Sequence, residues 1–133
     1  MGLVFQQFNL IPSLPVAANI AFQAELAGTH DPDRAARLAG RLGLSEHLQK
    51  YPEELSGGQQ QRVAIGRTLA AGPALILAAE PTGNLDEATS KAVMDLFLEL
   101  VADQGAALLM VTHSPALASQ LDRQVRLSRG KIS

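Results

Sequence analysis

The sequence contains no cysteine and no tryptophan, and only one tyrosine and four phenylalanines occur among its 133 residues. Without cysteine, neither a disulfide framework nor a thiolate metal site can form. No apolar run is long enough to cross a bilayer, and the first residues lack the basic and apolar regions of a signal peptide. We therefore expect any link to a membrane to run through a partner protein.

An excess of charge of either sign is also lacking. Eleven lysines and arginines face thirteen aspartates and glutamates, which gives a formal net charge of −2. No basic stripe is present, so we expect no nucleic-acid partner. The hydrophobic content of 47% is that of a folded protein, and the length suits one domain with a modest core.

The most informative stretch is Leu55–Arg67, which reads as a turn running into a helix. Ser56 is a good N-cap, and Gly57 and Gly58 remove side chains where another group could approach the backbone. A helix N-terminus bared by glycine suits an anion such as phosphate, because its amides are free and its dipole end is positive. Taken alone, however, two glycines favour an ordinary turn before a core helix.

The complete string Leu-Ser-Gly-Gly-Gln-Gln-Gln-Arg-Val-Ala-Ile resembles the signature motif of the ATP-binding cassette (ABC) ATPases. The resemblance implies a helix start that clamps the γ-phosphate of an ATP held mainly by a second subunit. The clamp would consist of Ser56, Gly57, Gly58 and Gln59. Gly66 stands where the family usually has a better helix former, at a cost of about 1 kcal/mol.

The segment before it begins with a short apolar run, Gly2–Phe5, which predicts a buried strand. Two nearby prolines make residues 6–15 a loop, and a glutamine there is usually solvated. The run Val-Phe-Gln-Gln-Phe-Asn-Leu-Ile-Pro nevertheless resembles the Q-loop of ABC ATPases. The resemblance implies that Gln6 senses Mg²⁺ and the attacking water, and that the following loop touches a membrane subunit.

A second apolar run, Ala74–Ala79, predicts a buried parallel strand with Glu80 at its carboxyl end, where chemistry is placed in open α/β sheets. Alone, Glu80 would be a solvated carboxylate. Together with the following Pro-Thr-Gly-Asn-Leu-Asp, the segment resembles the Walker B motif and D-loop of ABC ATPases. The resemblance implies that Glu80 is the general base and Asp86 communicates across the dimer; by residue type, Asp86 is also a strong N-cap.

A third apolar run, Ala106–Val111, ends in Thr-His-Ser-Pro. A lone histidine after a strand is most often structural. Val-Thr-His at this distance from Glu80 resembles the H-loop of the same family, which implies that His113 contacts the γ-phosphate.

Three departures from the family pattern concern nucleotide binding and catalysis. Ala79 stands where the family has the aspartate that orients the Mg²⁺ shell, and a methyl group cannot do this. The phosphate-cradling Gly-x-x-x-x-Gly-Lys-Ser/Thr is absent, as is the early aromatic residue that stacks on adenine. In the family that loop precedes the Q-loop, so we expect a cassette truncated before the Q-loop, with Met1 an internal methionine taken as a start. We expect no ATPase activity from the chain alone.

The expected fold is α/β, a partial P-loop NTPase cassette forming a single domain over residues 1–133. Residues 15–72 would form a helical signature subdomain, and residues 1–14 and 73–133 the remnant of a mainly parallel sheet whose strands are buried on both faces. Further elements are expected as follows: helices at Val16–Ala27, from Pro32 to Gly43, from Ser45, from Glu87 to Asp103 with a Glu87–Lys91 ion pair, and from Ser114, then a hairpin-like end over 124–132.

By resemblance, the chain is expected to be the ATP-binding component, or a fragment of it, of a transporter in the branch serving lipoprotein release and macrolide-type export. Its cofactors would be ATP and Mg²⁺. Its partners would be a second ABC ATPase subunit, head to tail, and a membrane permease that holds it at the cytoplasmic face of the cell membrane. Two alternatives are a non-catalytic binding protein that lends its signature helix to a partner's ATP, and a fragment without function.

Overall fold

The computed structural model describes residues 2–5, 8–112, 127–128 and 131–132. Its centre is a parallel sheet of three strands in the order β1-β2-β3. The strands are β1 (Gly2–Phe5), β2 (Leu75–Ala79) and β3 (Ala107–Val111). In the register of the sheet, Phe5 lies beside Ala79, and Ala79 lies beside Val111. The predicted α/β class with a parallel sheet is confirmed.

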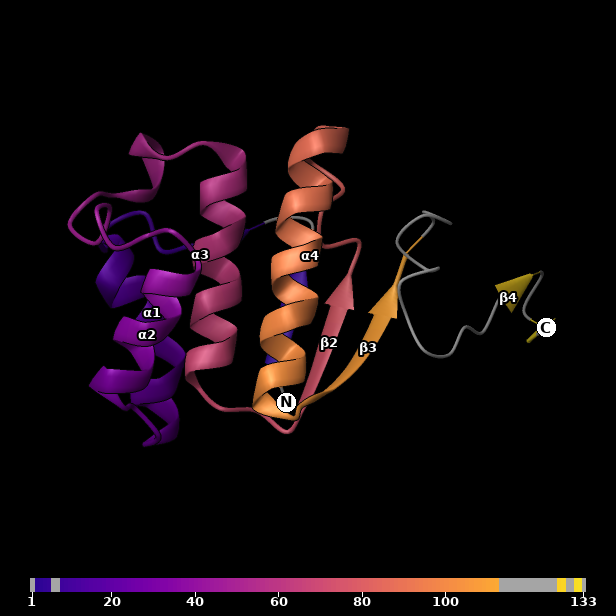
Figure 1. The fold of residues 1–133 in the computed structure, drawn as a ribbon, viewed down its shortest axis with the longest axis horizontal. Coiled ribbons are helices and arrows are strands. Elements are labelled where there is room, and N and C mark those ends of the chain that lie inside the picture. Colours follow the sequence, from indigo (N-terminus) through magenta and orange to yellow (C-terminus); the bar gives the residue numbers. More distant parts are fainter. Residues whose placement is uncertain (1, 6–7, 113–126, 129–130, 133) are drawn as a thin grey trace.

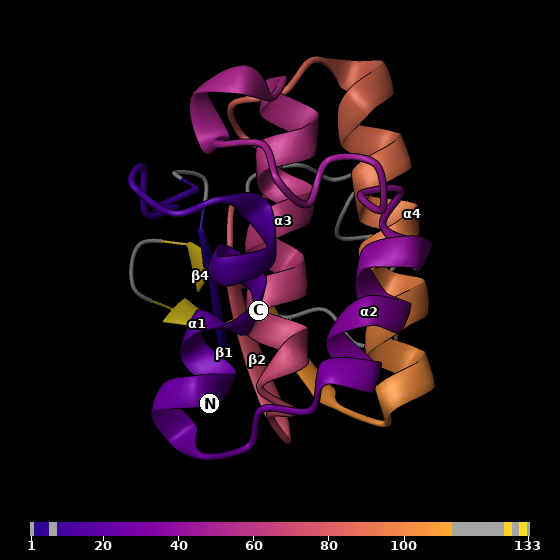
Figure 2. The ribbon, with the colours of Figure 1, turned by 90° about the vertical axis from the view of Figure 1, so that its left-hand side faces the viewer.

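Four α-helices accompany the sheet among the described residues: α1 (Val16–Ala27), α2 (Pro32–Arg41), α3 (Gly57–Ala70) and α4 (Glu87–Gln104), with a short 3-10 helix η1 (Pro52–Glu54) before α3. Figure 1 shows α3 and α4 side by side along the sheet, with α1 and α2 on the other side of α3. Figure 2 shows α1 and α2 in front of α3 from that side. Helix α3 is therefore the middle element of the helical layer.

The helix ends follow from local residue chemistry. Asp31 accepts hydrogen bonds from the amides of Asp33 and Arg34, which caps α2 one residue before Pro32. Gly28 and Gly105 end α1 and α4 in the left-handed conformation, with φ of 72° and 67°. The sequence predicted these boundaries to within one residue at α1 and α4.

The helix expected from Ser45 does not form. The amides of His47 and Lys50 bond only three residues back, to the carbonyls of Leu44 and His47, so the segment is a pair of turns. The carbonyls of residues 48 and 50 are needed elsewhere, because they accept from the first amides of α1, at Ala17 and Val16. This arrangement satisfies a helix N-terminus whose N-cap, Pro15, has no capping side chain.

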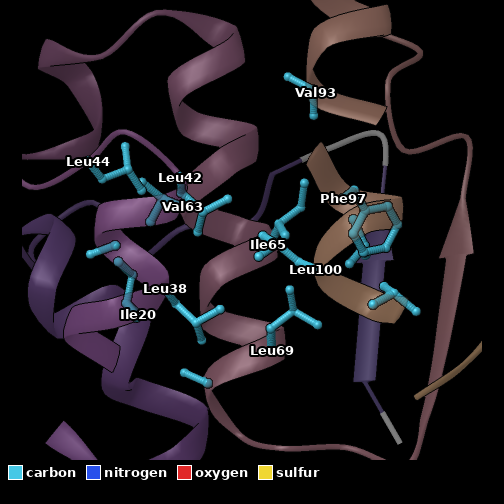
Figure 3. Packing of buried hydrophobic residues seen from close by; sticks show 14 of the residues in the cluster. Ile20, Leu38, Leu42, Leu44, Val63, Ile65, Leu69, Val93, Phe97 and Leu100 are labelled. Carbon is cyan, nitrogen blue, oxygen red and sulfur yellow. The ribbon is translucent and has the colours of Figure 1, made fainter. Parts of the chain in front are cut away.

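The core lies between the helices and one face of the sheet, and side chains of α3 lie at its centre. Figure 3 shows Ile65 and Leu69 of α3 between Leu38 on one side and Phe97 and Leu100 on the other. All five side chains are at most 6% exposed. Because the helix after the signature turn has apolar residues on most of its sides, the sequence predicts this burial, which the structure confirms.

The expectation that the strands are buried on both faces is wrong. Alternate residues such as Val4, Ile76 and Ala78 are buried beneath the helices, whereas Leu109 and Val111 on the opposite face are 58% and 56% exposed. In the part of the chain that the structure describes, α3 and α4 both lie against the same face of the sheet, so the opposite face is left exposed (Figure 1). Apolar runs of this kind are typical of parallel strands with helices on both faces.

Two smaller expectations have different outcomes. Lys91 pairs with Asp95 at 3.0 Å and not with Glu87, an exposed i,i+4 contact that adds little stability. At the C-terminal end, β4 (Leu127–Ser128) and β5 (Lys131–Ile132) pair antiparallel, which confirms the hairpin. The helix expected from Ser114 lies outside the described residues.

Candidate functional site at the start of helix α3

The signature turn forms a complete capping box. The Ser56 hydroxyl accepts from the Gln59 amide at 3.2 Å, and the Gln59 side-chain oxygen accepts from the Ser56 amide at 3.0 Å. This reciprocal pair fixes the entry of the chain into α3. It also gives an intramolecular role to the Gln59 side chain, which the family resemblance placed in the phosphate clamp.

The two glycines lie at the open first turn of α3. The capping box leaves their amides without an acceptor among the described residues, and Gly57 is exposed. A Cβ on Gly57 would lie 3.2 Å from Leu85 Cδ2, and one on Gly58 only 2.7 Å from Thr89 Cγ2. Gly58 is therefore also needed for packing inside the chain, whereas Gly57 leaves an amide accessible to an anion.

These contacts place the start of α4 against the start of α3. Asp86 is the N-cap of α4, and its carboxylate accepts from the Thr89 amide at 2.8 Å. That bond keeps the pKa of the Asp86 carboxyl below its ordinary value of 3.8. The structure thus brings Gly57, Gly58 and Asp86 to one neighbourhood, which the two motifs did not predict.

The depressed pKa of Asp86 predicts a pH dependence of stability. The folded state holds the ionised form, so this contribution is present above the ordinary pKa of 3.8 and is lost as the pH falls through the lower, folded value. Asp86→Asn keeps a capping oxygen but does not titrate. We expect the urea midpoint of the wild-type chain to fall more than that of Asp86→Asn between about pH 5 and about pH 2.5. Equal losses would contradict this assignment.

Glu80 lies directly after β2, at the carboxyl edge of the sheet. Its amide donates to the Val111 carbonyl at 2.8 Å, and its carboxylate accepts from the Thr112 hydroxyl at 3.3 Å. Its φ of 44° lies in the left-handed region, which is uncommon for a residue other than glycine. Such strain persists only where the surroundings fix it, and it is concentrated at functional sites.

Helix α3 is also bonded to this strand end. The side-chain amide of Gln61, which is fully buried, donates to the carbonyl of Pro81, the residue after Glu80. Sequence reasoning missed Gln61, because it treated α3 as a mainly apolar helix. A polar residue within the buried stripe was the signal that could have identified it.

A magnesium site does not emerge from these residues. Ala79 presents a half-buried methyl group beside Glu80, and no group of three histidine, aspartate or glutamate side chains among the described residues could hold a metal ion. Gln6, the predicted metal-shell residue, and His113, the predicted phosphate contact, both lie outside the described residues. The described donor set therefore does not fit Mg²⁺, and we assign no step to it.

The chain belongs to the ABC transporter family, because residues 1–83 match the profile of that family. It is 47% identical over 135 residues to an uncharacterised ABC transporter ATP-binding protein of Mycobacterium tuberculosis. It is 46% identical to the lipoprotein-releasing system ATP-binding protein LolD of Novosphingobium aromaticivorans and 44% identical to the macrolide export ATP-binding/permease protein MacB of Syntrophobacter fumaroxidans.

Each match covers 99% of this chain but only 54%, 60% and 19% of the three relatives, in the order named. Among solved structures, the dimeric bacterial ABC transporter cassette MJ0796 superposes with a TM-score of 0.81 at 36% identity. That match covers 99% of this chain and 60% of the cassette. The predicted family and the partial-cassette fold are confirmed. No helix among the described residues is long and apolar enough to span a membrane.

Proposed function

We propose that this chain is an ATP-binding component of an ABC transporter that presents its signature turn to an ATP shared with a second cassette. The observation that carries the proposal is the open start of α3. There the capping box fixes the turn and leaves the Gly57 and Gly58 amides without acceptors among the described residues. Backbone amides at a helix start, aimed at an anionic oxygen, bind phosphate through strong charge-assisted hydrogen bonds.

The partners and location follow from the same proposal. The solved cassette MJ0796 is described as dimeric, and a second structure of it is bound to ADP and Pi. The LolD relatives are named for lipoprotein release and the MacB relatives for macrolide export. We place this chain in a head-to-tail pair of cassettes at the cytoplasmic face of the membrane, attached to a permease that exports a lipoprotein or a small molecule.

Ala79 favours a particular version of this function, in which the chain donates its signature turn without hydrolysing ATP at its own site. The residue stands beside Glu80 and offers no oxygen to a metal shell. In this version Glu80, Gln6 and His113 keep their family positions, and Asp86 contacts the partner, while the partner cassette supplies the phosphate cradle. A chain without function is the competing possibility.

A complementation experiment tests the proposal. We mix the chain with an intact cassette of the lipoprotein-release type whose own signature motif is disabled, and measure phosphate release from Mg²⁺-ATP. The wild-type chain is expected to restore hydrolysis at one composite site. Gly57→Asp is expected to lower the restored rate by about a hundredfold, because a carboxylate would block the open turn and repel phosphate.

The structure also supplies the matched control. Leu85 Cδ2, the nearest atom to a Cβ at Gly57, is the far end of a flexible side chain, so Gly57→Asp should fold. Gly40→Asp adds the same charge at an exposed glycine of α2, where the nearest contact, 3.6 Å, is ordinary, and it should leave the restored rate unchanged. Absence of rescue by the wild-type chain, or equal rescue by Gly57→Asp, would refute the proposed role.

A further inference from the structure

Arg67 is a buried arginine of α3 whose charge has no carboxylate partner among the described residues. The residue is 8% exposed, and its Nε atom has no hydrogen-bond partner in the same part of the chain. Its terminal nitrogens donate to two carbonyls, that of Asn9 at 2.8 Å and that of Phe8 at 3.3 Å. Burial lowers the pKa of the Arg67 guanidinium. Burying a charge without a counter-charge is unfavourable in free energy, so we expect the buried Arg67 to have a specific role.

The two carbonyls belong to the loop that follows the predicted Gln6 position, and they are close together because of the backbone at Asn9. Asn9 has a φ of 54°, in the left-handed region that asparagine tolerates better than most residues. This conformation lets one planar guanidinium reach two consecutive carbonyls. A lysine ammonium at the same place is a point charge and lacks the fork that reaches both.

A second buried side chain holds the far end of the same loop. Asn19 of α1 is fully buried; its oxygen accepts from the Ile11 amide at 2.8 Å, and its nitrogen donates to the carbonyls of Ile11 at 3.1 Å and Leu14 at 2.9 Å. The loop is therefore bonded to α3 near residues 8 and 9, and to α1 near residues 11 and 14. Both attachments are to helices and neither is to the sheet.

We propose that Arg67 is a positioning residue that fixes the loop after Gln6 to the signature helix through the Phe8 and Asn9 carbonyls. Arg67 lies in the last turn of α3, so the helix and the loop keep one relative arrangement and a shift of the helix moves the loop with it. Any effect of this attachment on how the loop senses nucleotide rests on the proposed function. The attachment itself involves only residues of this chain. It is therefore tested without nucleotide or partner.

The test measures hydrogen exchange of the Ile11 amide in the full chain. This amide is bonded to Asn19, so it reports whether the loop stays closed. Arg67→Met keeps much of the side-chain length but cannot donate, and it is expected to raise the exchange rate about tenfold or more. Arg67→Lys, which donates from a single nitrogen, should give an intermediate rate.

Thr68→Val is the matched control. The Thr68 hydroxyl, on the next residue of the same helix and also buried, donates to the Leu3 carbonyl of β1 at 3.0 Å. Its removal should destabilise the protein without changing Ile11 exchange by more than about twofold at matched stability. An unchanged Ile11 rate in Arg67→Met, or an equal rise in Thr68→Val, overturns the proposal. Should Arg67→Met not fold, Arg67→Lys decides alone: faster Ile11 exchange than in Thr68→Val supports the proposal, and an equal rate overturns it.

The outcome is separable from that of the proposed function. Failure of the chain to restore hydrolysis in the complementation experiment would leave the Ile11 measurement unaffected. Conversely, an exchange rate of the Ile11 amide that stays the same when Arg67 is replaced would overturn the attachment, even if the signature turn acts in trans.

Discussion

Replacing Phe97 by alanine is expected to lower the free energy of unfolding by about 3–5 kcal/mol. Phe97 lies on the buried side of α4, is 0% exposed, and faces Ile65 of α3 across the core (Figure 3). Its removal loses apolar burial and leaves a cavity that the packed helices can fill only in part. Because domains are commonly stable by only about 5–15 kcal/mol, this one change would remove a large share of the total.

Leu26→Ala is the control for this prediction. Leu26 lies in α1 and is 75% exposed, so its replacement should change the free energy of unfolding by no more than about 0.5 kcal/mol. Urea unfolding followed by circular dichroism measures both variants. A Phe97→Ala variant as stable as Leu26→Ala would show that α4 does not pack as described.

The second large effect is an absence of turnover. Purified chain is expected to release no more phosphate from Mg²⁺-ATP than its Glu80→Gln variant, although enzymes commonly turn over at about 1–1,000 per second. Ala79 supplies no oxygen to a metal shell, and the sequence has no Gly-x-x-x-x-Gly-Lys-Ser/Thr to cradle the β- and γ-phosphates. A base at Glu80 therefore has no organised phosphate to serve.

Ala79→Asp is the sharper form of the same prediction. Restoring the carboxylate alone should not bring activity, because the cradle remains absent from the sequence. An intact cassette assayed in parallel shows that the conditions support hydrolysis. Measurable turnover by the single variant would mean that another part of this chain binds the phosphates.

Much of the fold was readable from local signals. Asp31 before Pro32, Ser56 before two glycines, and Asp86 after a turn each have a side chain that satisfies a helix N-terminus, so three helix starts were predictable. The turns after Ser45 were not. Their form depends on carbonyls that serve the start of α1, a tertiary relation that no local pattern carries.

The candidate site likewise has features that the sequence indicates and features that only the structure shows. Gly57, Gly58, Glu80 and Asp86 stand in contiguous motifs that resemble those of the family, so the sequence singles them out as candidates. The nearness of Gly57 and Gly58 to the start of α4 came only from the structure. Arg67 was missed as a loop contact, because its partners are backbone carbonyls far away in the chain. Carbonyls have no residue signature, so hydrogen bonds to them cannot be read from sequence.

The parallel pairing of β1 with β2 has a consequence for how this chain folds. Gly2 lies beside Ile76, so the two strands meet only after every residue of α1, α2 and α3 has been made. Closing so long a loop lowers the chain entropy before any stabilising contact between the strands has formed, and such non-local pairing slows folding. Helices α1 and α3 pack through contacts of shorter range. We therefore expect the helices to associate first during synthesis, and β1 to pair with β2 only after β2 has been made.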